Sequence, residues 1–147
     1  KVQFDISQLL IELSALMTYQ TKRLGIKLTL DQPKRCIINA NREYIGQALL
    51  NLIVNATQHT PKKGKISVKI EEVKCFLNIS ISDTGSGIKK EILPLIFESN
   101  SSSKKEVYNA GLGLALVKRV IDDHMGKIEV SSEINLGTTF KIKLSNL

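Results

Sequence analysis

Two asparagines four residues apart stand out in the stretch NLIVNATQHT, residues 51–60. Asparagine is a poor helix former, because its side chain competes for backbone hydrogen bonds. Asn51 and Asn55 nevertheless lie in the most regular helical pattern of the chain. At positions i and i+4 their amides share one face of that helix, one turn apart. Gln47 and Gln58 extend them to a polar row beside the apolar residues.

Neutral amides suit a site that already holds negative charge. An amide oxygen is a hard ligand of the kind magnesium prefers, and it adds no charge where phosphates supply several. A row that only faced solvent would favour Lys and Glu. The other interpretation is a helix edge that hydrogen-bonds a neighbouring loop, and this row taken alone favours that interpretation slightly.

Two glycine motifs also have spacing that suits a ligand. In DTGSGI, which starts at Asp83, Gly85 and Gly87 allow a sharp turn and a close approach to a flat ligand; the alternative is a strand-ending turn capped by the aspartate. In NAGLGLAL, which starts at Asn109, Gly111 and Gly113 expose N–H groups at a helix start, which attracts phosphate. The alternative there is a loosened helix start. The second motif is neither a P-loop nor a dinucleotide fingerprint.

Hydrophobic spacing predicts the elements that must position these residues. Helices are expected at 5–23, at 41–59, and from the second glycine motif to a cap at Gly126. Strands are expected around 26–30, 36–38, 66–70, 77–81, 128–130 and 140–144. The third and fourth of these strands form a hairpin, and 36–38 is expected to pair with 26–30 across Pro33. Residues 98–110 have no apolar period and read as a loop.

The length of 147 residues favours one domain, 1–147. The element order predicts an α+β fold, with a mixed, mostly antiparallel sheet and helices on one face. The formal charge of +7 indicates an anionic partner: nucleic acid, an acidic protein, a membrane or a phosphorylated ligand. No apolar run is long enough to span a membrane. Cys36 and Cys75 lack the spacing of a zinc site and read as free thiols.

Taken together and in order, five stretches closely resemble the ATP-binding catalytic domain of bacterial sensor histidine kinases. They are NLIVNATQHTP, SDTGSGI, LIFES, GLGLALVKRVIDDHMGKIEVSS and GTTF. The resemblance runs from about Phe4 to Leu144. It implies the Bergerat fold, a two-layer sandwich with about five strands and three main helices, shared with gyrase, MutL and the ninety-kilodalton heat-shock chaperones.

The resemblance also implies a role for each motif in binding ATP and Mg²⁺. Asn55 matches the magnesium ligand, Asn51 its partner at the nucleotide, and His59 a ring that lies against adenine. Asp83 matches the acceptor for the adenine amine, with Thr138 assisting it. The pocket is shaped by Gly85, Gly87 and Ile88; the phosphate-facing helix start is Gly111, Leu112 and Gly113; residues 98–110 correspond to the ATP lid.

Three residues depart from the family pattern. Gln58 stands where a phosphate-binding lysine is common, Asn109 replaces the first glycine of GxGxG, and Asn100 replaces an aromatic residue. Lys104 or Lys105 could supply the missing cation. Relatives that hydrolyse ATP place a glutamate at position 51, and Asn51 cannot act as a base.

The resemblance implies a catalytic half that passes phosphate to a histidine on a dimerisation domain expected before residue 1. The expected partners are ATP or ADP, that domain and a response regulator, without nucleic acid. The fragment is expected to be monomeric and the full protein to be a homodimer, with this part on the cytoplasmic side of a membrane-anchored sensor. Two alternatives stay open: a nucleotide-binding pseudokinase, favoured by Gln58 and Asn109, and a basic nucleic-acid-binding module, favoured by charge alone.

Overall fold

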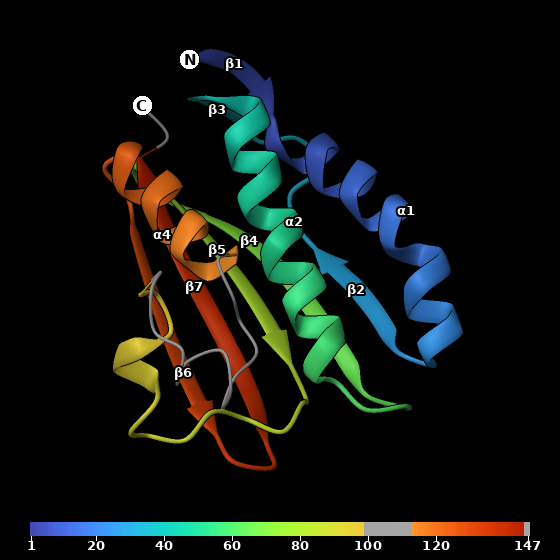
Figure 1. Ribbon diagram of the computed structural model, residues 1–147. Helices are drawn as coiled ribbons and strands as arrows, with labels where there is room; N and C mark the ends of the chain where they lie inside the picture. Colours follow the sequence, from blue (N-terminus) through green and yellow to red (C-terminus); the bar gives the residue numbers. More distant parts are fainter. Residues whose placement is uncertain (99–112, 146–147) are drawn as a thin grey trace.

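A mixed sheet forms one layer of the protein, and helices cover one of its faces (Figure 1). The computed structural model describes residues 1–98 and 113–145. The strand order is β2-β4-β5-β7-β6, in which β2 runs parallel to β4 and the other neighbours are antiparallel. The strands are β2 (Lys27–Asp31), β4 (Lys65–Val73), β5 (Phe76–Asp83), β6 (Lys127–Glu133) and β7 (Gly137–Ser145). The predicted α+β sandwich is confirmed.

Three α-helices of the described residues make the second layer: α1 (Ile6–Leu24), α2 (Arg42–His59) and α4 (Gly113–Asp123). A short 3₁₀ turn, η1 (Leu93–Leu95), precedes the undescribed residues. The side chain of Asp5 caps α1 by accepting from Ser7 N–H, and that of Asn41 caps α2 by accepting from Tyr44 N–H. Such caps satisfy N–H groups that have no partner inside the helix, so both helices begin within one residue of the expected positions.

The core lies between the helices and the inner face of the sheet. Period-two alternation in β4, β5 and β7 puts one apolar set on this face. The buried residues of these strands are Ile66, Val68, Ile70, Leu77, Ile79, Ile81, Phe140, Ile142 and Leu144. The apolar side of α2 packs against them through Ile45, Leu49, Leu52 and Ile53. This packing holds α2 rigidly across the sheet, which matters because α2 carries the asparagines.

The expected pairing of residues 36–38 with 26–30 is wrong. Strand β3 (Ile37–Ala40) instead pairs antiparallel with β1 (Val2–Asp5), and together they form a separate two-stranded sheet. Strand β2 pairs with β4. No strand was predicted before the first helix, but the first residues of the chain form β1. The Asp5 carboxylate fixes this arrangement, because it accepts from both Ser7 N–H and Cys36 N–H at 3.0 Å.

The end of α4 differs from the expectation that Gly126 caps it in a left-handed conformation. Met125 takes the positive φ of 56°, and Gly126 does not. Gly126 is needed for another reason: a Cβ there would lie 2.7 Å from the carbonyl oxygen of Lys143 and 2.6 Å from a methyl group of Leu144. The glycine therefore lets the end of α4 approach β7 closely.

His124 joins the end of α4 to the start of α2. Its Nε2 lies 3.1 Å from the backbone nitrogen of Asn41, and its Nδ1 lies 2.8 Å from the carbonyl oxygen of Val120. An amide N–H can only donate and a carbonyl can only accept, so Nδ1 carries the proton. Both ring nitrogens of His124 therefore make structural hydrogen bonds that join α4 to α2.

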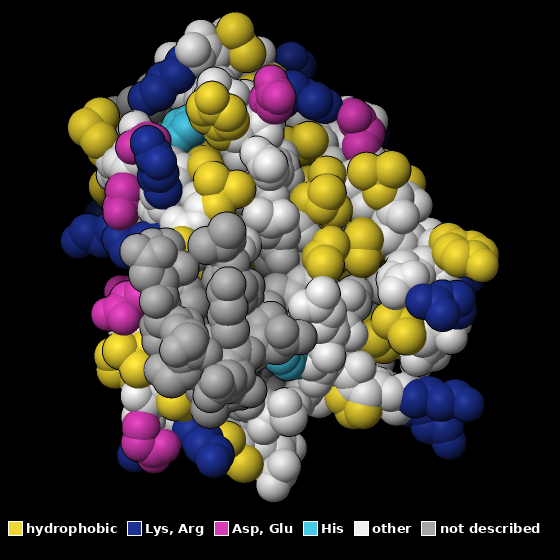
Figure 2. All heavy atoms as spheres, viewed as in Figure 1, with side chains coloured by type: hydrophobic (Ala, Val, Ile, Leu, Met, Phe, Trp, Pro, Cys, Tyr) yellow, Lys and Arg dark blue, Asp and Glu magenta, His cyan; other side chains and the backbone are white. Residues whose placement is uncertain are grey.

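The molecular surface is mixed in character. On the helix-covered face, hydrophobic side chains gather over α1 and α2, and Lys and Arg side chains lie apart around the periphery (Figure 2). Ile11, Leu16 and Tyr19 of α1 are exposed. None of the helices in the described part of the chain has the length and apolar character needed to cross a bilayer.

Candidate functional site

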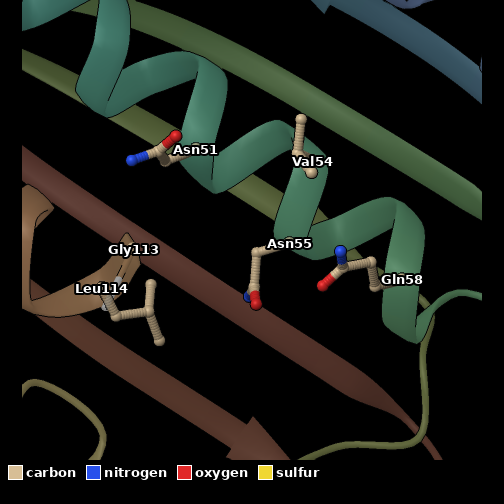
Figure 3. A pocket seen from close by; sticks show the side chains of 6 residues that line it. All are labelled: Asn51, Val54, Asn55, Gln58, Gly113 and Leu114. Atoms are coloured by element: carbon tan, nitrogen blue, oxygen red, sulfur yellow. The ribbon is translucent and has the colours of Figure 1, made fainter. Parts of the chain in front are cut away.

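A hollow of about 180 Å³ opens between the second half of α2 and the start of α4. Asn51, Asn55 and Gln58 extend into the space between α2 and the start of α4, where Gly113 and Leu114 lie (Figure 3). Asn55 is the most enclosed of the three amides, with 7% of its surface exposed. The structure thus brings three of the predicted site residues on α2 together with the predicted helix start.

The polar row of α2 divides into two parts. Gln47, its first member, is exposed and lines a different hollow with Tyr44 and Leu116. The hollow at Asn51 is lined by amide and apolar side chains, and no charged side chain of the described residues lines it. A polyanion bound there would meet neutral donors and the N-terminus of α4, whose dipole favours negative charge.

The second part of the site is Asp83, which ends β5 and is 8% exposed. Its Oδ1 accepts from Gly85 N–H at 2.8 Å, so the turn cap that the sequence offered as an alternative does form. Burial raises the pKa of Asp83, and hydrogen bonds from the backbone N–H groups of Gly85 and Thr138 and the nearby His59 oppose this rise. A carboxylate has about four acceptor positions, so two remain after these two bonds.

The glycine loop after Asp83 packs against the last turn of α2. Ser86 N–H donates to the carbonyl of His59 at 3.3 Å, which satisfies a terminal helix carbonyl. A Cβ on Gly85 would overlap that same carbonyl, and a Cβ on Gly87 would overlap the carbonyl of Glu133. Gly87 also has a φ of 79°. Both glycines therefore allow close approach of backbone to backbone, and Gly87 the left-handed conformation too.

His59 connects the two parts of the site. It lies one helical turn after Asn55, and its ring is close enough to Asp83 for each to affect the charge of the other. Burial lowers the pKa of His59, and the Asp83 carboxylate acts in the opposite direction. The neutral imidazole is therefore favoured, as an apolar ring against a flat ligand would require.

Thr138 stands directly beside Asp83 in the sheet. The register pairs Ile66 with Asp83, Asp83 with Thr138, and Thr138 with Ser132. Residues directly opposite each other in a sheet have side chains on the same face, and Ile66 is fully buried in the core. Asp83, Thr138 and Ser132 therefore form one polar row on the helix-covered face, at the edge of the core.

Ser132 was not predicted as a site residue. Its Oγ lies 2.7 Å from the backbone nitrogen of Ile88 and 2.8 Å from Oγ1 of Thr138. A signal for it was present in the sequence. Ile128 and Val130 alternate on the inner face of the expected strand, and Ser132 is the next inward position. A serine that continues an apolar alternation is a candidate for a buried polar contact.

The donor set around Asn55 fits magnesium carried by a polyphosphate. Among residues 1–98 and 113–145, no three His, Cys, Asp or Glu side chains are grouped so that they could hold a metal. Magnesium commonly uses one or two protein oxygens and takes its remaining ligands from phosphates and water. The amide oxygen of Asn55 would be the protein ligand here, and it fits this pattern.

Several predicted residues lie outside the part of the chain that the structure describes. These are Asn100, Lys104, Lys105, Asn109, Gly111 and Leu112, with all of the expected ATP lid after Glu98. Gly113 is described, and a Cβ there would lie 3.9 Å from Nδ2 of Asn51, an ordinary contact. The described residues therefore leave room for a larger side chain at position 113.

Gly137→Ala is expected to destabilise the fold by about 2–4 kcal/mol. Gly137 has a φ of 132°, and a Cβ there would overlap the backbone carbonyl of Asp83. A backbone strained in this way costs roughly 1–3 kcal/mol before the overlap is added. Urea unfolding followed by circular dichroism measures the effect. Gly113→Ala is the matched control and should change stability by less than about 1 kcal/mol; equal losses in both variants would contradict the assignment.

Comparison with known sequences gives one family. The profile of the histidine kinase-, DNA gyrase B- and HSP90-like ATPases matches residues 40–146. The sensor protein SrrB of Staphylococcus aureus is 32% identical over 143 residues, which cover 95% of this chain and 24% of SrrB. The chain therefore spans about a quarter of the length of this relative.

Comparison with solved structures agrees with the sequence. The nucleotide-free catalytic domain of histidine kinase ThkA superposes with a TM-score of 0.88 at 26% identity, over 99% of this chain and 96% of that domain. Full-length ShkA in complex with AMPPNP has a TM-score of 0.86 at 26% identity, over 99% of this chain and 31% of ShkA. ThkA in complex with the response regulator TrrA shares the fold, with a TM-score of 0.84 at 24% identity, over 99% of this chain and 42% of ThkA.

Proposed function

The chain belongs to the histidine kinase-, DNA gyrase B- and HSP90-like ATPase family and is an ATP-binding domain of the sensor histidine kinase type; from this membership we propose that it holds magnesium-ATP and passes the γ-phosphoryl group to a histidine on another domain. The single observation that supports this best is the order of groups along α2. Its amides face the start of α4, and His59, one turn later, lies beside Asp83. The middle of this rigid helix thus faces the proposed phosphate end of the site, and its last turn faces the proposed base end.

At the base end, Asp83 and Thr138 offer hydrogen-bond acceptors to an amine. Asp83 is held in place by the backbone N–H groups of Gly85 and Thr138. The ring of His59 lies near Asp83, so a flat base that pairs with Asp83 would lie against this ring. Ile88, which is buried at the end of the glycine loop, contributes an apolar wall. These residues would bind and orient adenine without taking part in bond breaking.

At the phosphate end, the residues position charge and do not act as a base. Magnesium, when bound, neutralises the charge that develops on the phosphate oxygens. Asn55 would hold it, and Asn51 and Gln58 would contact the nucleotide from the same face. Gly113, with Gly111 and Leu112, would place the N–H groups of α4 against the phosphates. Lys104 and Lys105 are proposed to contact the terminal phosphate.

The proposed reaction is phosphoryl transfer to nitrogen. A histidine nitrogen of the partner domain attacks the γ-phosphorus, and a P–N bond forms. The bond from the γ-phosphorus to the bridging oxygen breaks, and ADP leaves with that electron pair. An amide at position 51 cannot remove a proton from water, so the site favours a supplied nucleophile. Catalysis of this kind depends mainly on positioning and electrostatic stabilisation.

The proposed partners follow from the relatives. The chain spans a quarter of SrrB. For the full protein we propose a dimerisation domain that carries the phosphoacceptor histidine and forms a homodimer. The complex of ThkA with TrrA makes a response regulator the proposed recipient of the phosphoryl group. We place this domain on the cytoplasmic side, where ATP is available.

A nucleotide-binding pseudokinase is the second candidate. Gln58 lines the hollow at Asn51, and no cationic side chain of the described residues lines it. Without a cation at the terminal phosphate, binding could occur without efficient transfer. The two candidates make different predictions for the same assay.

The function is tested by phosphoryl transfer in trans. We expect the chain to label a separately added helical hairpin from its own full-length protein when γ-labelled ATP and magnesium are present. We expect negligible release of inorganic phosphate by the chain alone, because Asn51 cannot activate water. Replacing Lys104 and Lys105 with Ala should reduce transfer more than it reduces ADP binding, since ADP lacks the terminal phosphate.

Each outcome of this assay has a distinct meaning. Tight magnesium-ATP binding without label on the hairpin would establish the pseudokinase instead. Rapid phosphate release without the hairpin would contradict the role given to Asn51. Lys62→Ala with Lys63→Ala removes the same charge from an exposed turn after α2 and serves as the control for the double lysine variant.

A further inference from the structure

The hydroxyl of Ser132 makes three contacts, and they determine which atom carries each proton. Ile88 N–H points to Ser132 Oγ at 2.7 Å, the carbonyl oxygen of Gly137 lies 3.0 Å from it, and Thr138 Oγ1 lies 2.8 Å from it. A serine hydroxyl has one proton to donate and two lone pairs that accept. The three contacts use all of this capacity.

Only one arrangement of protons satisfies all three contacts. A backbone N–H can only donate, so Ile88 occupies one lone pair of Ser132. A carbonyl can only accept, so the single Ser132 proton goes to Gly137. The second lone pair of Ser132 is then left for Thr138, which must donate its own hydroxyl proton. Thr138 consequently has no proton left for a ligand, and its remaining capacity is that of an acceptor.

This acceptor lies beside Asp83, which ends β5 at the opposite register position of Thr138. The two side chains share the helix-covered face of the sheet, and both are buried. With the Thr138 proton directed to Ser132, both groups present lone pairs. A ligand amine, or a water that donates to both, matches this pair of acceptors, and a ligand carbonyl does not. A carbonyl placed there would leave buried acceptors unpaired, which is costly.

Ser132 also ties the glycine loop to the β6–β7 hairpin. Ile88 N–H, at the end of the loop, donates to Ser132. In the other direction, Asn135 N–H of the hairpin donates to the carbonyl oxygen of Ser86 in the loop at 2.8 Å. Gly87 lies against the Glu133 carbonyl. The same serine thus sets both the position of the loop and the direction of the Thr138 hydroxyl.

We propose that Ser132 is a positioning residue that makes the base pocket selective for a purine with an exocyclic amine, by holding the Thr138 hydroxyl as an acceptor. This inference rests on the proposed function, since it assumes that a purine nucleotide binds at Asp83. Ser132 acts through Thr138 and Ile88 and does not itself contact the nucleotide.

The test compares ATP with ITP, which has a carbonyl in place of the adenine amine. Calorimetric titration of the 147-residue chain gives the ratio of the two affinities. Ser132→Ala frees the Thr138 proton, so the variant can donate to a carbonyl. We expect the ratio to fall about tenfold, which corresponds to about 1.4 kcal/mol. Ser131→Ala is the matched control: it is the neighbouring exposed serine on β6 and should leave the ratio unchanged.

Further variants separate selectivity from simple loss of structure. If Ser132 acts through Thr138, adding Ser132→Ala to Thr138→Val should leave the ratio where Thr138→Val alone puts it. Ser132→Thr keeps the hydroxyl and should keep the ratio. Ser132→Cys keeps the size of the side chain, but its sulfur is a weak acceptor. It provides the same comparison if the alanine variant does not fold.

The outcomes distinguish this inference from the proposed function. A wild-type chain that does not bind ATP overturns both. A wild-type chain that prefers ATP to ITP, with a folded Ser132→Ala variant of unchanged preference, overturns only the role of Ser132. If Ser132→Ala reduces the ATP preference by the same factor in the wild-type and Thr138→Val backgrounds, Ser132 does not act through Thr138. That result would also overturn the role of Ser132.

Discussion

Asp83→Asn is expected to lower the affinity for ATP by about 10- to 100-fold and to remove much of the preference for ATP over ITP. A hydrogen bond to a charged acceptor contributes roughly 1.5–3 kcal/mol. The carboxamide that replaces the carboxylate presents both a donor and an acceptor, so it can pair with a carbonyl as readily as with an amine. Titration of wild type and variant with ATP, ITP and GTP measures the change. Unchanged discrimination in the variant would show that Asp83 does not read the base.

The same substitution is expected to stabilise the folded chain at neutral pH. Burial raises the pKa of Asp83 in the folded state above its ordinary value of 3.8, so the folded chain disfavours the ionised form. The contribution of Asp83 to stability is therefore largest below the ordinary value and is lost as the pH rises through the raised pKa. Asparagine carries no charge, so the gain in Asp83→Asn should be present at pH 7 and disappear toward pH 3.

Urea unfolding at several pH values tests this dependence. Asp31→Asn makes the same change in charge at an exposed position of β2 and should show little gain. A variant that loses base preference while it gains stability identifies Asp83 as a group kept for binding at a cost to the fold. A loss of stability at pH 7 in Asp83→Asn would mean that the backbone bonds to the carboxylate outweigh its burial.

Asn55→Ala is expected to weaken magnesium-ATP binding by about 10- to 100-fold while changing metal-free ADP binding only a few-fold. Loss of groups that hold or orient a metal typically costs 10- to 100-fold in metal affinity or activity. Asn55 is buried within the hollow that faces α4, so alanine also removes its contacts there. That loss is common to both nucleotides and cancels in the comparison. Titrations with and without magnesium give both numbers.

Two variants control for the chemistry of position 55. Gln47→Ala removes an amide from the same helix at an exposed position that lines another hollow, and it should bind magnesium-ATP normally. Asn55→Asp keeps an oxygen ligand but adds negative charge beside the phosphates, so it should restore binding only in part. Equal weakening of both nucleotides in Asn55→Ala would show that the asparagine has a structural role.

Local features of the fold were predictable from the sequence because local forces determine them. The caps at Asp5 and Asn41 and the apolar period of α2 depend on residues within one or two turns. The hairpin of β4 and β5 depends on alternation and a short connection. For the same reason the relative placement of Asn51, Asn55 and Gln58 on one side of α2 followed from helical spacing alone.

Features that depend on distant partners were not predictable in this way. Alternation shows which side of a strand is buried, but not which strand lies next to it, so the pairing of β3 with β1 was missed. Gly126 was expected to take the left-handed conformation after α4, but Met125 takes it instead. A glycine is needed at position 126 because a side chain there would collide with β7. Ser132 belongs to the same class, because its importance depends on Ile88 and Thr138 from two other segments.

The strand order has a consequence for synthesis of the protein. Among the described strands, β7 comes last in sequence, yet it lies between β5 and β6 in the sheet. Until β7 has emerged from the ribosome, one side of β5 is an unpaired edge and β6 has no neighbour in the described sheet. Asp83 meanwhile lacks Thr138, its partner from β7. The sheet can therefore be completed only after β7 has been synthesised, through a pairing between distant segments that is intrinsically slow. Nonsense mutations anywhere before β7 are accordingly expected to be null alleles with aggregation-prone products, and not partial losses of function.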